Sequence, residues 1–281
     1  MNHAVGKLRL TLTMRFLAAF LLATQLFAQT PANPPDAKAQ PAPSNPAVEN
    51  ARKAQGVIRK TIIALGGDAY LKVFDLKQEG RGFGFSKGAS TGVGAPFVRY
   101  YQYPDKERWE YFKDGEWVII RVGDQGYDTT WRGTREEDPQ SLAAYNRRRQ
   151  YALDRVLRQW AFDPKTAFFY DGQTMMDTKQ VHKIVMVSPE NLSVILYIDV
   201  RTDLPVRKSY SFRDEYRDLK EESELFDMYR VIQGINTPFR YTRMLGADIT
   251  SQIFMKVVSY NVGAGDAIFK PKEINYNKLK R

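Results

Sequence analysis

The hydrophobic pattern of the chain begins with a helical period. Between residues 46 and 65, apolar side chains recur at helical spacing, and charged side chains occupy the positions between them. The pair Gly66-Gly67 follows and can supply the left-handed backbone that ends a helix. We therefore expect a helix over residues 46–65, followed by a short helical turn near residues 68–74.

The pattern then changes to the two-residue period of a strand. Residues 80–85 place three glycines on one face of the strand and Arg81, Phe83 and Phe85 on the other. A strand face without side chains lets another backbone or a helix approach closely. We expect such an approach at the glycine face.

Short strand-like segments follow, separated by turn sequences rich in Gly, Asp and Pro. The predicted strands cover residues 97–103, 107–113, 116–122 and 126–131, which is the pattern of a meander of hairpins. Trp109 and Tyr111 share one face, as do Trp117 and Ile119. Aromatic bulk therefore collects on what we expect to be the concave side of a curved sheet. The alternative is that these residues simply fill a core.

A helical pattern interrupts the strands between residues 141 and 162, with Asp-Pro pairs at both ends. Its apolar stripe contains Leu142, Tyr145, Leu153, Val156, Leu157 and Trp160. Burying each large apolar side chain is worth roughly 1.5–3 kcal/mol, so exposing the stripe would be costly. We expect this helix to cover the mouth of the curved sheet and to gate an apolar cavity, with Arg147, Arg148 and Arg149 on its outer face meeting anionic headgroups. The alternative is a helix packed permanently as core, with no cavity beneath it.

Strand patterns resume after this helix and continue almost to the end of the chain. They cover residues 167–170, 178–187, 193–200, 205–213, 222–232, 239–245 and 248–260. The chain is therefore predicted to be mainly β (α+β), with about eleven strands and two helices.

The N-terminal segment predicts export. Lys7, Arg9 and Arg15 precede an apolar run that ends at Ala28, the arrangement of a cleavable secretory signal peptide. The run is shorter than the roughly 20 residues that span a bilayer, which makes a retained anchor the weaker alternative. Met14 is an alternative start that leaves the mature chain unchanged. We expect a signal peptide over residues 1–28, a disordered linker over 29–45, a single β domain over 46–272 and a basic tail over 273–281.

Composition narrows the chemistry. The chain has no cysteine, which excludes a lipid anchor on cysteine, disulfides, thiolate nucleophiles and metal sites that use cysteine. The net charge of +10 includes three positive residues of the signal region, which leaves +7 for the mature chain. Such a charge favours anionic partners such as membrane-surface lipids, although it also suits a merely well-hydrated surface. The exported location makes nucleic acid an unsuitable partner.

Catalytic signals are weak. His182 is the only histidine outside the signal region, and it lies within a predicted strand without a serine in a nucleophile-elbow context. The acidic clusters at residues 136–138 and 221–224 lie beside turns, where acidic runs are usually solvated. We expect no catalytic residue, no metal site and no cofactor.

The second half of the chain resembles a known family. Residues 194–207 read as a strand, an Asp-x-x-Thr-x-Leu-Pro turn and a returning strand. Residues 226–239 end in Gly-Ile-Asn-Thr-Pro-Phe, and residues 256–271 hold a closing strand with an Ile-Phe-Lys-Pro tail. In order and spacing, these motifs resemble those of the outer-membrane lipoprotein carrier and sorting superfamily (LolA/LolB-like). The resemblance covers residues 178–271, and the N-terminal half follows it by architecture only.

The resemblance implies a LolA-like fold, which is a strongly curved, half-open antiparallel β-barrel-like sheet with two covering helices. It also implies an apolar cavity that shields acyl chains in transit between membranes. No counterpart of the carriers' lid-controlling arginine can be placed in this sequence, so the identity of the cargo stays open.

These observations favour a periplasmic carrier or binding protein for lipoprotein acyl chains or another lipid-like apolar ligand. An envelope-stress sensor or a protein-interaction subunit without transport is the alternative, and an enzyme comes third. Membrane-surface anions or an envelope protein are further candidate partners. The candidate cavity and lid residues are Phe83, Phe85, Trp109, Tyr111, Trp117, Ile119, Leu142, Tyr145, Val156 and Trp160.

Overall fold

The computed structural model describes residues 45–272 of the chain. The expected signal peptide, nearly all of the expected linker and the basic tail lie outside these residues. Within residues 45–272, no helix combines the length and the apolar character needed to cross a membrane.

The first helix is α1, Pro46–Leu65, as the hydrophobic pattern predicted. The side chain of Asn45 caps it by accepting a hydrogen bond from the Ala47 amide. Gly66 ends it with a φ of 130°, and a Cβ there would lie 2.6 Å from the carbonyl oxygen of Gly234. Only glycine fits this junction, because a side chain would meet both strain and a backbone atom.

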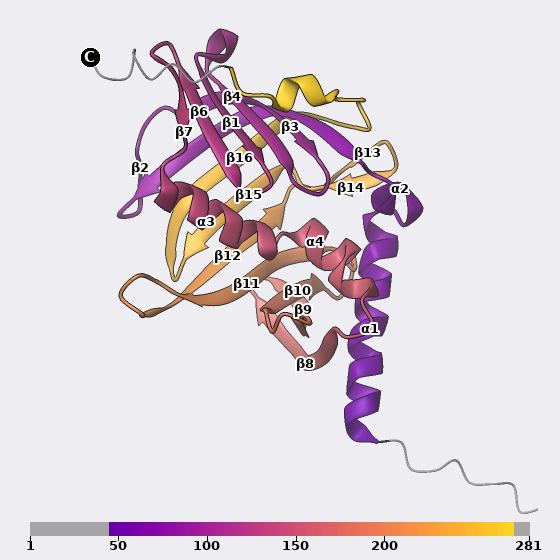
Figure 1. Cartoon of the computed structure of the whole chain (residues 1–281). Helices are drawn as coiled ribbons and strands as arrows, with labels where there is room; N and C mark the ends of the chain where they lie inside the picture. Colours follow the sequence, from indigo (N-terminus) through magenta and orange to yellow (C-terminus); the bar gives the residue numbers. More distant parts are fainter. Residues whose placement is uncertain (1–44, 273–281) are drawn as a thin grey trace, which may run out of the picture. The chain divides into compact units, whose positions relative to one another are not determined.

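Most of the remaining chain forms one large antiparallel sheet, which Figure 1 shows curving around a hollow. The strands are β1 (Asp75–Ser86), β2 (Ala89–Ser90), β3 (Ala95–Gln102), β4 (Lys106–Tyr111), β5 (Trp117–Val122), β6 (Gln125–Thr130), β7 (Gly133–Glu136), β8 (Ala167–Met176), β9 (Lys179–Val187), β10 (Ser193–Asp199), β11 (Pro205–Arg213), β12 (Leu219–Asp227), β15 (Arg240–Leu245) and β16 (Asp248–Tyr260). A separate hairpin pairs β13 (Arg230–Ile232) with β14 (Ile235–Thr237). The sheet is not closed, since β7 and β8 form its two edges. The predicted mainly β, half-open architecture is confirmed.

The order of strands in the sheet is β7-β6-β5-β4-β3-β1-β16-β15-β12-β11-β10-β9-β8. Strand β1 therefore joins the N-terminal strands to the C-terminal strands, by pairing with β3 on one side and β16 on the other. The ladder with β16 contains a bulge between Glu79 and Gly80. A Cβ at Gly80 would overlap the carbonyl oxygen of Phe254 in the paired strand, whereas a Cβ at Gly82 would meet no atom within 4 Å, so the expected close approach of another backbone occurs at Gly80 and not along the whole glycine face.

The helices that follow β7 correct a prediction. Instead of one helix over residues 141–162, the chain forms α3 (Pro139–Gln150), α4 (Leu153–Arg158) and a short 3₁₀ turn (Trp160–Phe162). The break falls at Ala152, which has an extended backbone with ψ of 137°. Its cause is tertiary. The carbonyl of Tyr151 accepts a hydrogen bond of 2.8 Å from the Lys208 ammonium, and its ring stacks on Tyr210 with centroids 3.9 Å apart.

The main hydrophobic core lies where α1 and α4 pack against the C-terminal strands. Its fully buried side chains include Val156 and Leu157 from α4 and Ile184, Met186, Val194, Leu196 and Ile198 from β9 and β10. Trp160 is also part of it. The second half of the expected lid helix is therefore core, as the alternative interpretation held, whereas α3 has no buried side chain.

Smaller differences concern strand ends. The predicted strand 222–232 is divided into β12 and β13 because Met228, between them, has a positive φ of 54°. Strand β8 continues to Met176, beyond the predicted end at residue 170. The short strands β2, β7 and β14 were not predicted.

Leu157→Ala should lower the free energy of unfolding by about 2–5 kcal/mol, because it leaves a cavity between α4 and the sheet. Leu157 has 0% exposure, whereas the control position Ile63 on α1 is 71% exposed. Ile63→Ala should change stability by less than about 0.5 kcal/mol. Chemical denaturation of the three proteins measures both values. Equal losses would contradict the assignment of α4 to the core.

Candidate functional site

A cavity of about 560 Å³ lies on the concave side of the sheet. Its walls come from strands on both sides of the β1–β16 ladder, and residues of α3 and of the start of α4 cover it. Figure 1 shows these helices lying across the hollow of the sheet. The volume falls within the range of roughly 300–1,000 Å³ that is typical of small-molecule sites.

One wall of the cavity is a continuous aromatic surface. The ring of Trp109 stacks on Tyr111 with centroids 5.7 Å apart, and Tyr111 stacks on Trp117 at 4.8 Å. Phe97 packs against Trp109 at 4.9 Å. The register explains the surface, because Tyr111 lies opposite Phe97 on one side and Trp117 on the other. The predicted sharing of a face by these aromatic residues is confirmed.

Tyrosine dominates the rest of the lining. Nine tyrosines belong to it, namely Tyr70, Tyr101, Tyr103, Tyr111, Tyr145, Tyr210, Tyr229, Tyr241 and Tyr260. Burial raises the pKa of Tyr111 to about 12, and the pKa values of Tyr101, Tyr145 and Tyr241 are also raised by burial. These hydroxyls therefore stay protonated at neutral pH, so the lining combines apolar ring faces with hydrogen-bond donors.

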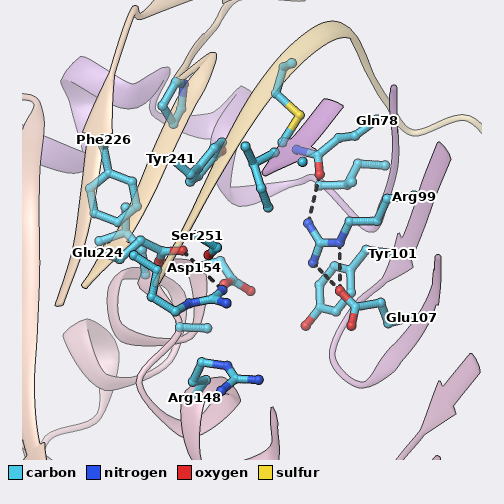
Figure 2. Close-up of a pocket in the computed structure, with 18 of the residues that line it drawn as sticks. Gln78, Arg99, Tyr101, Glu107, Arg148, Asp154, Glu224, Phe226, Tyr241 and Ser251 are labelled. Carbon is cyan, nitrogen blue, oxygen red and sulfur yellow. Dashed lines mark hydrogen bonds and ion pairs between the residues drawn. The ribbon is translucent and has the colours of Figure 1, made fainter. Parts of the chain in front are cut away.

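A buried ion-pair network runs through the aromatic wall. The Glu107 carboxylate lies 2.6 Å from Arg99 and 3.2 Å from Arg121, and Arg121 also reaches Glu137 at 2.5 Å. Figure 2 shows Arg99 held between Gln78 and Glu107. Burial acts to raise the pKa of Glu107, but the two guanidinium charges outweigh it and hold the pKa below its ordinary value.

A second network lies on the opposite wall, where Figure 2 places Glu224 near Phe226 and Tyr241. Lys208 contacts Glu224 at 3.1 Å, and Arg243 lies 3.6 Å from Glu222 and 3.9 Å from Glu224. Burial opposes ionisation of Glu224, yet the charges of Lys208 and Arg243 lower its pKa. The cavity is therefore not purely apolar, which revises the expectation from the sequence.

Three charged side chains of the lining, Arg148, Arg149 and Asp154, belong to neither network, and Arg149 bonds to backbone carbonyls. Arg148 and Asp154 make no hydrogen bond or ion pair with another side chain in residues 45–272, and no dashed line reaches Arg148 in Figure 2. Burial raises the pKa of Asp154 despite the nearby charges of Lys208 and Arg158.

The ten candidate site residues divide equally. Phe83, Trp109, Tyr111, Trp117 and Tyr145 line the cavity. Phe85, Ile119, Leu142, Val156 and Trp160 do not. For the five residues that line the cavity, a role in ligand binding stays a prediction.

The five residues outside the lining lie elsewhere in the fold. Val156 and Trp160 are in the core, because the break in the helix turns α4 toward α1. Ile119 pairs with Trp109 across the strands but lies outside the lining, and Phe85 pairs with the short strand β2. Leu142 packs toward Gly126 of β6.

The predicted position of the three consecutive arginines of α3 is also wrong. They were expected on the outer face of the helix, but all three are half-buried. Arg147 lies 3.7 Å from the ring centroid of Phe212, while Arg148 and Arg149 line the cavity. Arg149 donates hydrogen bonds to the carbonyls of Asp105 and Gly123.

The buried network around Glu107 was missed in the sequence, although a signal for it was present. Glu107 has the same parity as Trp109 and Tyr111 in β4, so alternation alone puts its carboxylate on the aromatic face. A carboxylate on a buried face requires a cationic partner. Arg121 lies directly opposite Glu107 in β5, and Arg99 lies opposite Trp109 in β3, which is a diagonal position on the same face.

Comparison with known proteins supports the fold. No protein-family model matches the chain, and no curated protein matches it in sequence. A DUF1329 family protein from Desulfovibrio piger superposes with a TM-score of 0.55 at 12% identity, covering 79% of this chain and 97% of that one. An outer membrane lipoprotein-sorting protein domain from Vibrio parahaemolyticus has a TM-score of 0.50 at 10% identity, covering 83% and 100%. A LolA superfamily protein from Nitrosomonas europaea has a TM-score of 0.47 at 11% identity, covering 77% and 97%.

These similarities come from structure at low sequence identity and concern the fold. The resemblance to lipoprotein-sorting domains that the sequence motifs suggested is therefore confirmed at the level of architecture.

Glu107→Gln should destabilise the protein by about 3–5 kcal/mol at pH 7, because it leaves two buried guanidiniums without their shared carboxylate. The lowered pKa of Glu107 means that its contribution is present above its unfolded pKa of about 4.3 and is lost as the pH falls through the folded value. The difference between variant and wild type should thus shrink in acid. Denaturation at several pH values measures it.

Glu79→Gln is the matched control for this experiment. Glu79 pairs with Lys77 at the surface, where its side chain is 37% exposed against 3% for Glu107. Its loss should cost at most about 1 kcal/mol. Equal effects of the two substitutions would contradict the buried network.

His182→Ala should leave ligand binding intact. His182 lies on β9 outside the cavity lining, where its Nδ1 is 3.0 Å from the Tyr170 hydroxyl. Among residues 45–272, no cluster of three or more His, Asp or Glu side chains could hold a metal ion. A large loss of function in a folded His182→Ala protein, with its circular dichroism unchanged, would instead indicate a catalytic role.

Proposed function

We propose that this chain is a periplasmic binding or carrier protein that holds a lipid or a lipoprotein acyl chain in the cavity under α3. The observation that carries the proposal is the cavity itself, with its stacked aromatic wall on the concave face of a half-open sheet. Burying apolar surface contributes roughly 0.8 kcal/mol per CH₂ group. An acyl chain lying against these rings would therefore gain affinity along its length.

The difference in packing between α3 and α4 suggests how a ligand enters the cavity. In the described residues, α4 is anchored by fully buried side chains, whereas α3 has none. Segments with few buried apolar contacts open at a lower free-energy cost than the core. We infer that α3 can move away from the sheet while α4 stays fixed, so that α3 rather than the whole predicted helix is the lid.

Binding suits the lining better than catalysis. The carboxylates of Glu107 and Glu224 are engaged in ion pairs, and their lowered pKa values keep them ionised. A general acid or base works best with a pKa near the working pH. The periplasmic location follows from the signal peptide expected over residues 1–28, and the lipoprotein-sorting domain from Vibrio parahaemolyticus shares the fold.

A second candidate function is interaction with an envelope protein or a membrane surface. The antiparallel order places the β2–β3, β6–β7 and β11–β12 connections at the same end of the sheet. Apolar side chains project there, with Val93 90% and Trp131 84% exposed. Large exposed apolar side chains at one end of the sheet are available to contact a partner. Capture of an envelope protein that is lost on Trp131→Ser, without bound lipid, would favour this function.

Gly82→Phe should block the cavity. Gly82 lies in the lining, and a Cβ there would meet no atom within 4 Å. Phenylalanine is favourable in a strand, so the ring can occupy the cavity while the sheet still forms. The variant should bind a fluorescent fatty-acyl probe about tenfold more weakly or worse, a loss of about 1.4 kcal/mol. Fluorescence titration and a thermal melt measure binding and folding together.

Gly92→Phe is the control, since its Cβ would also meet no atom within 4 Å but the residue lies in the loop before β3 and outside the lining. It should bind the probe as the wild type does. A wild type that binds no probe, or a folded Gly82→Phe protein that binds it equally well, would overturn the proposed function.

A further inference from the structure

The Arg148 side chain lines the cavity and makes no hydrogen bond or ion pair within residues 45–272. Six basic side chains and four acidic side chains line the cavity as the described residues form it. The basic members are Arg99, Arg121, Arg148, Arg149, Lys208 and Arg243, and the acidic members are Glu107, Asp154, Glu222 and Glu224. The excess is therefore positive.

The other basic side chains of the lining are satisfied. Arg99 and Arg121 share Glu107, Lys208 contacts Glu224, and Arg243 lies near Glu222 and Glu224. Arg149 donates to two backbone carbonyls. Among these six residues, Arg148 alone has a side chain with neither a hydrogen bond nor an ion pair within residues 45–272.

The surroundings of Arg148 make its charge unfavourable without a hydrogen-bonded anion. Burial and the charge of Arg243 lower its pKa, and the charge of Glu222 opposes them without forming an ion pair with it. A guanidinium stays charged even so. A half-buried guanidinium that has lost part of its hydration without gaining an ion pair is stabilised when an anion is supplied.

A second group beside it also lacks a partner. The hydroxyl of Tyr145 is buried and has no hydrogen-bond partner in the described part of the chain. Tyr145 precedes Arg148 by three residues in α3, so the two side chains lie on the same face of the helix. The ring of Tyr145 is held 4.0 Å from the Arg121 guanidinium. Together they offer a hydroxyl donor and a guanidinium fork toward the same cavity.

We propose that Arg148 and Tyr145 form an anion-binding subsite in the roof of the cavity, and that the ligand is an amphiphile with one acidic headgroup. Its carboxylate or phosphate accepts hydrogen bonds from the guanidinium and from the tyrosine hydroxyl, and its apolar chain lies against the aromatic wall. Arginine suits this role because its planar fork matches both kinds of oxyanion. The inference rests on the proposed function and adds the class of ligand.

This subsite also assigns a role to α3. The anion bound to Arg148 would hold the helix over the cavity, in place of the buried apolar contacts that α3 lacks. A neutral lipid would leave Arg148 unpaired and would gain only the contacts of its chain.

The test compares ligands that share a twelve-carbon chain. Laurate, dodecyl phosphate and dodecanol are titrated into the full-length mature protein by calorimetry, with inorganic phosphate alone as a fourth ligand. The wild type should bind the two anionic amphiphiles about tenfold or more tightly than dodecanol. Inorganic phosphate should bind weakly. Arg148→Gln should remove the preference for the anionic ligands and leave dodecanol binding unchanged.

Arg59→Gln is the matched control, because it removes the same charge from an exposed position of α1. It should keep the preference. Arg148→Gln should also melt at the same temperature as the wild type or higher, since a half-buried charge without an ion pair is removed. A lower melting temperature with equal loss of laurate and dodecanol would make Arg148 a structural residue and overturn the subsite.

The remaining outcomes separate the two proposals. If laurate and dodecanol bind the wild type equally and Arg148→Gln changes neither, the anionic subsite is wrong while the proposed function stands. If inorganic phosphate binds as tightly as dodecyl phosphate, the site takes a free anion and the amphiphile is wrong. If no twelve-carbon ligand binds, the proposed function itself fails.

Discussion

The backbone ladder between β1 and β16 is the contact on which the cavity depends. Strand β1 also pairs with β3, so it joins the strands of the two halves of the chain into one surface. The lining takes Arg99 and Glu107 from one side of this junction and Glu224 and Tyr241 from the other. Both buried ion-pair networks therefore face a common space only while this ladder is formed. The bulge at Gly80 is part of it, because no side chain fits there.

The break between α3 and α4 determines which helix covers the cavity. The Lys208 ammonium donates a hydrogen bond to the Tyr151 carbonyl, and the ring of Tyr210 stacks on the ring of Tyr151. These two contacts end α3, and α4 starts in a new direction. The apolar side chains of α4 then enter the core, and the polar, arginine-rich α3 remains as the roof. A roof held by polar contacts can respond to the charge of what lies beneath it. In this way one tertiary hydrogen bond links the packing of the core to the chemistry of the cavity.

Local properties of the sequence predicted the strands well and the helical interruption poorly. Strands β9 to β11 end within one residue of the predicted limits, because alternation and turn residues are short-range signals. The break at Tyr151 depends on Lys208, which is 57 residues away in the chain. The aromatic wall followed from the parity of Trp109 and Tyr111. The side of α3 that faces the cavity, and hence the position of Arg148, depends on that break and could not be predicted from periodicity.

The account's central claim is that an acyl chain lies between α3 and the concave face of the sheet. The most direct measurement is photo-crosslinking of the mature protein with a fatty acid that carries a diazirine on its chain, followed by mass spectrometry of the labelled peptides. The account predicts label on wall residues such as Trp109 or Tyr241, and its loss when unlabelled fatty acid competes. Label confined to exposed loop positions such as Trp131, or label that competitor does not reduce, would contradict it.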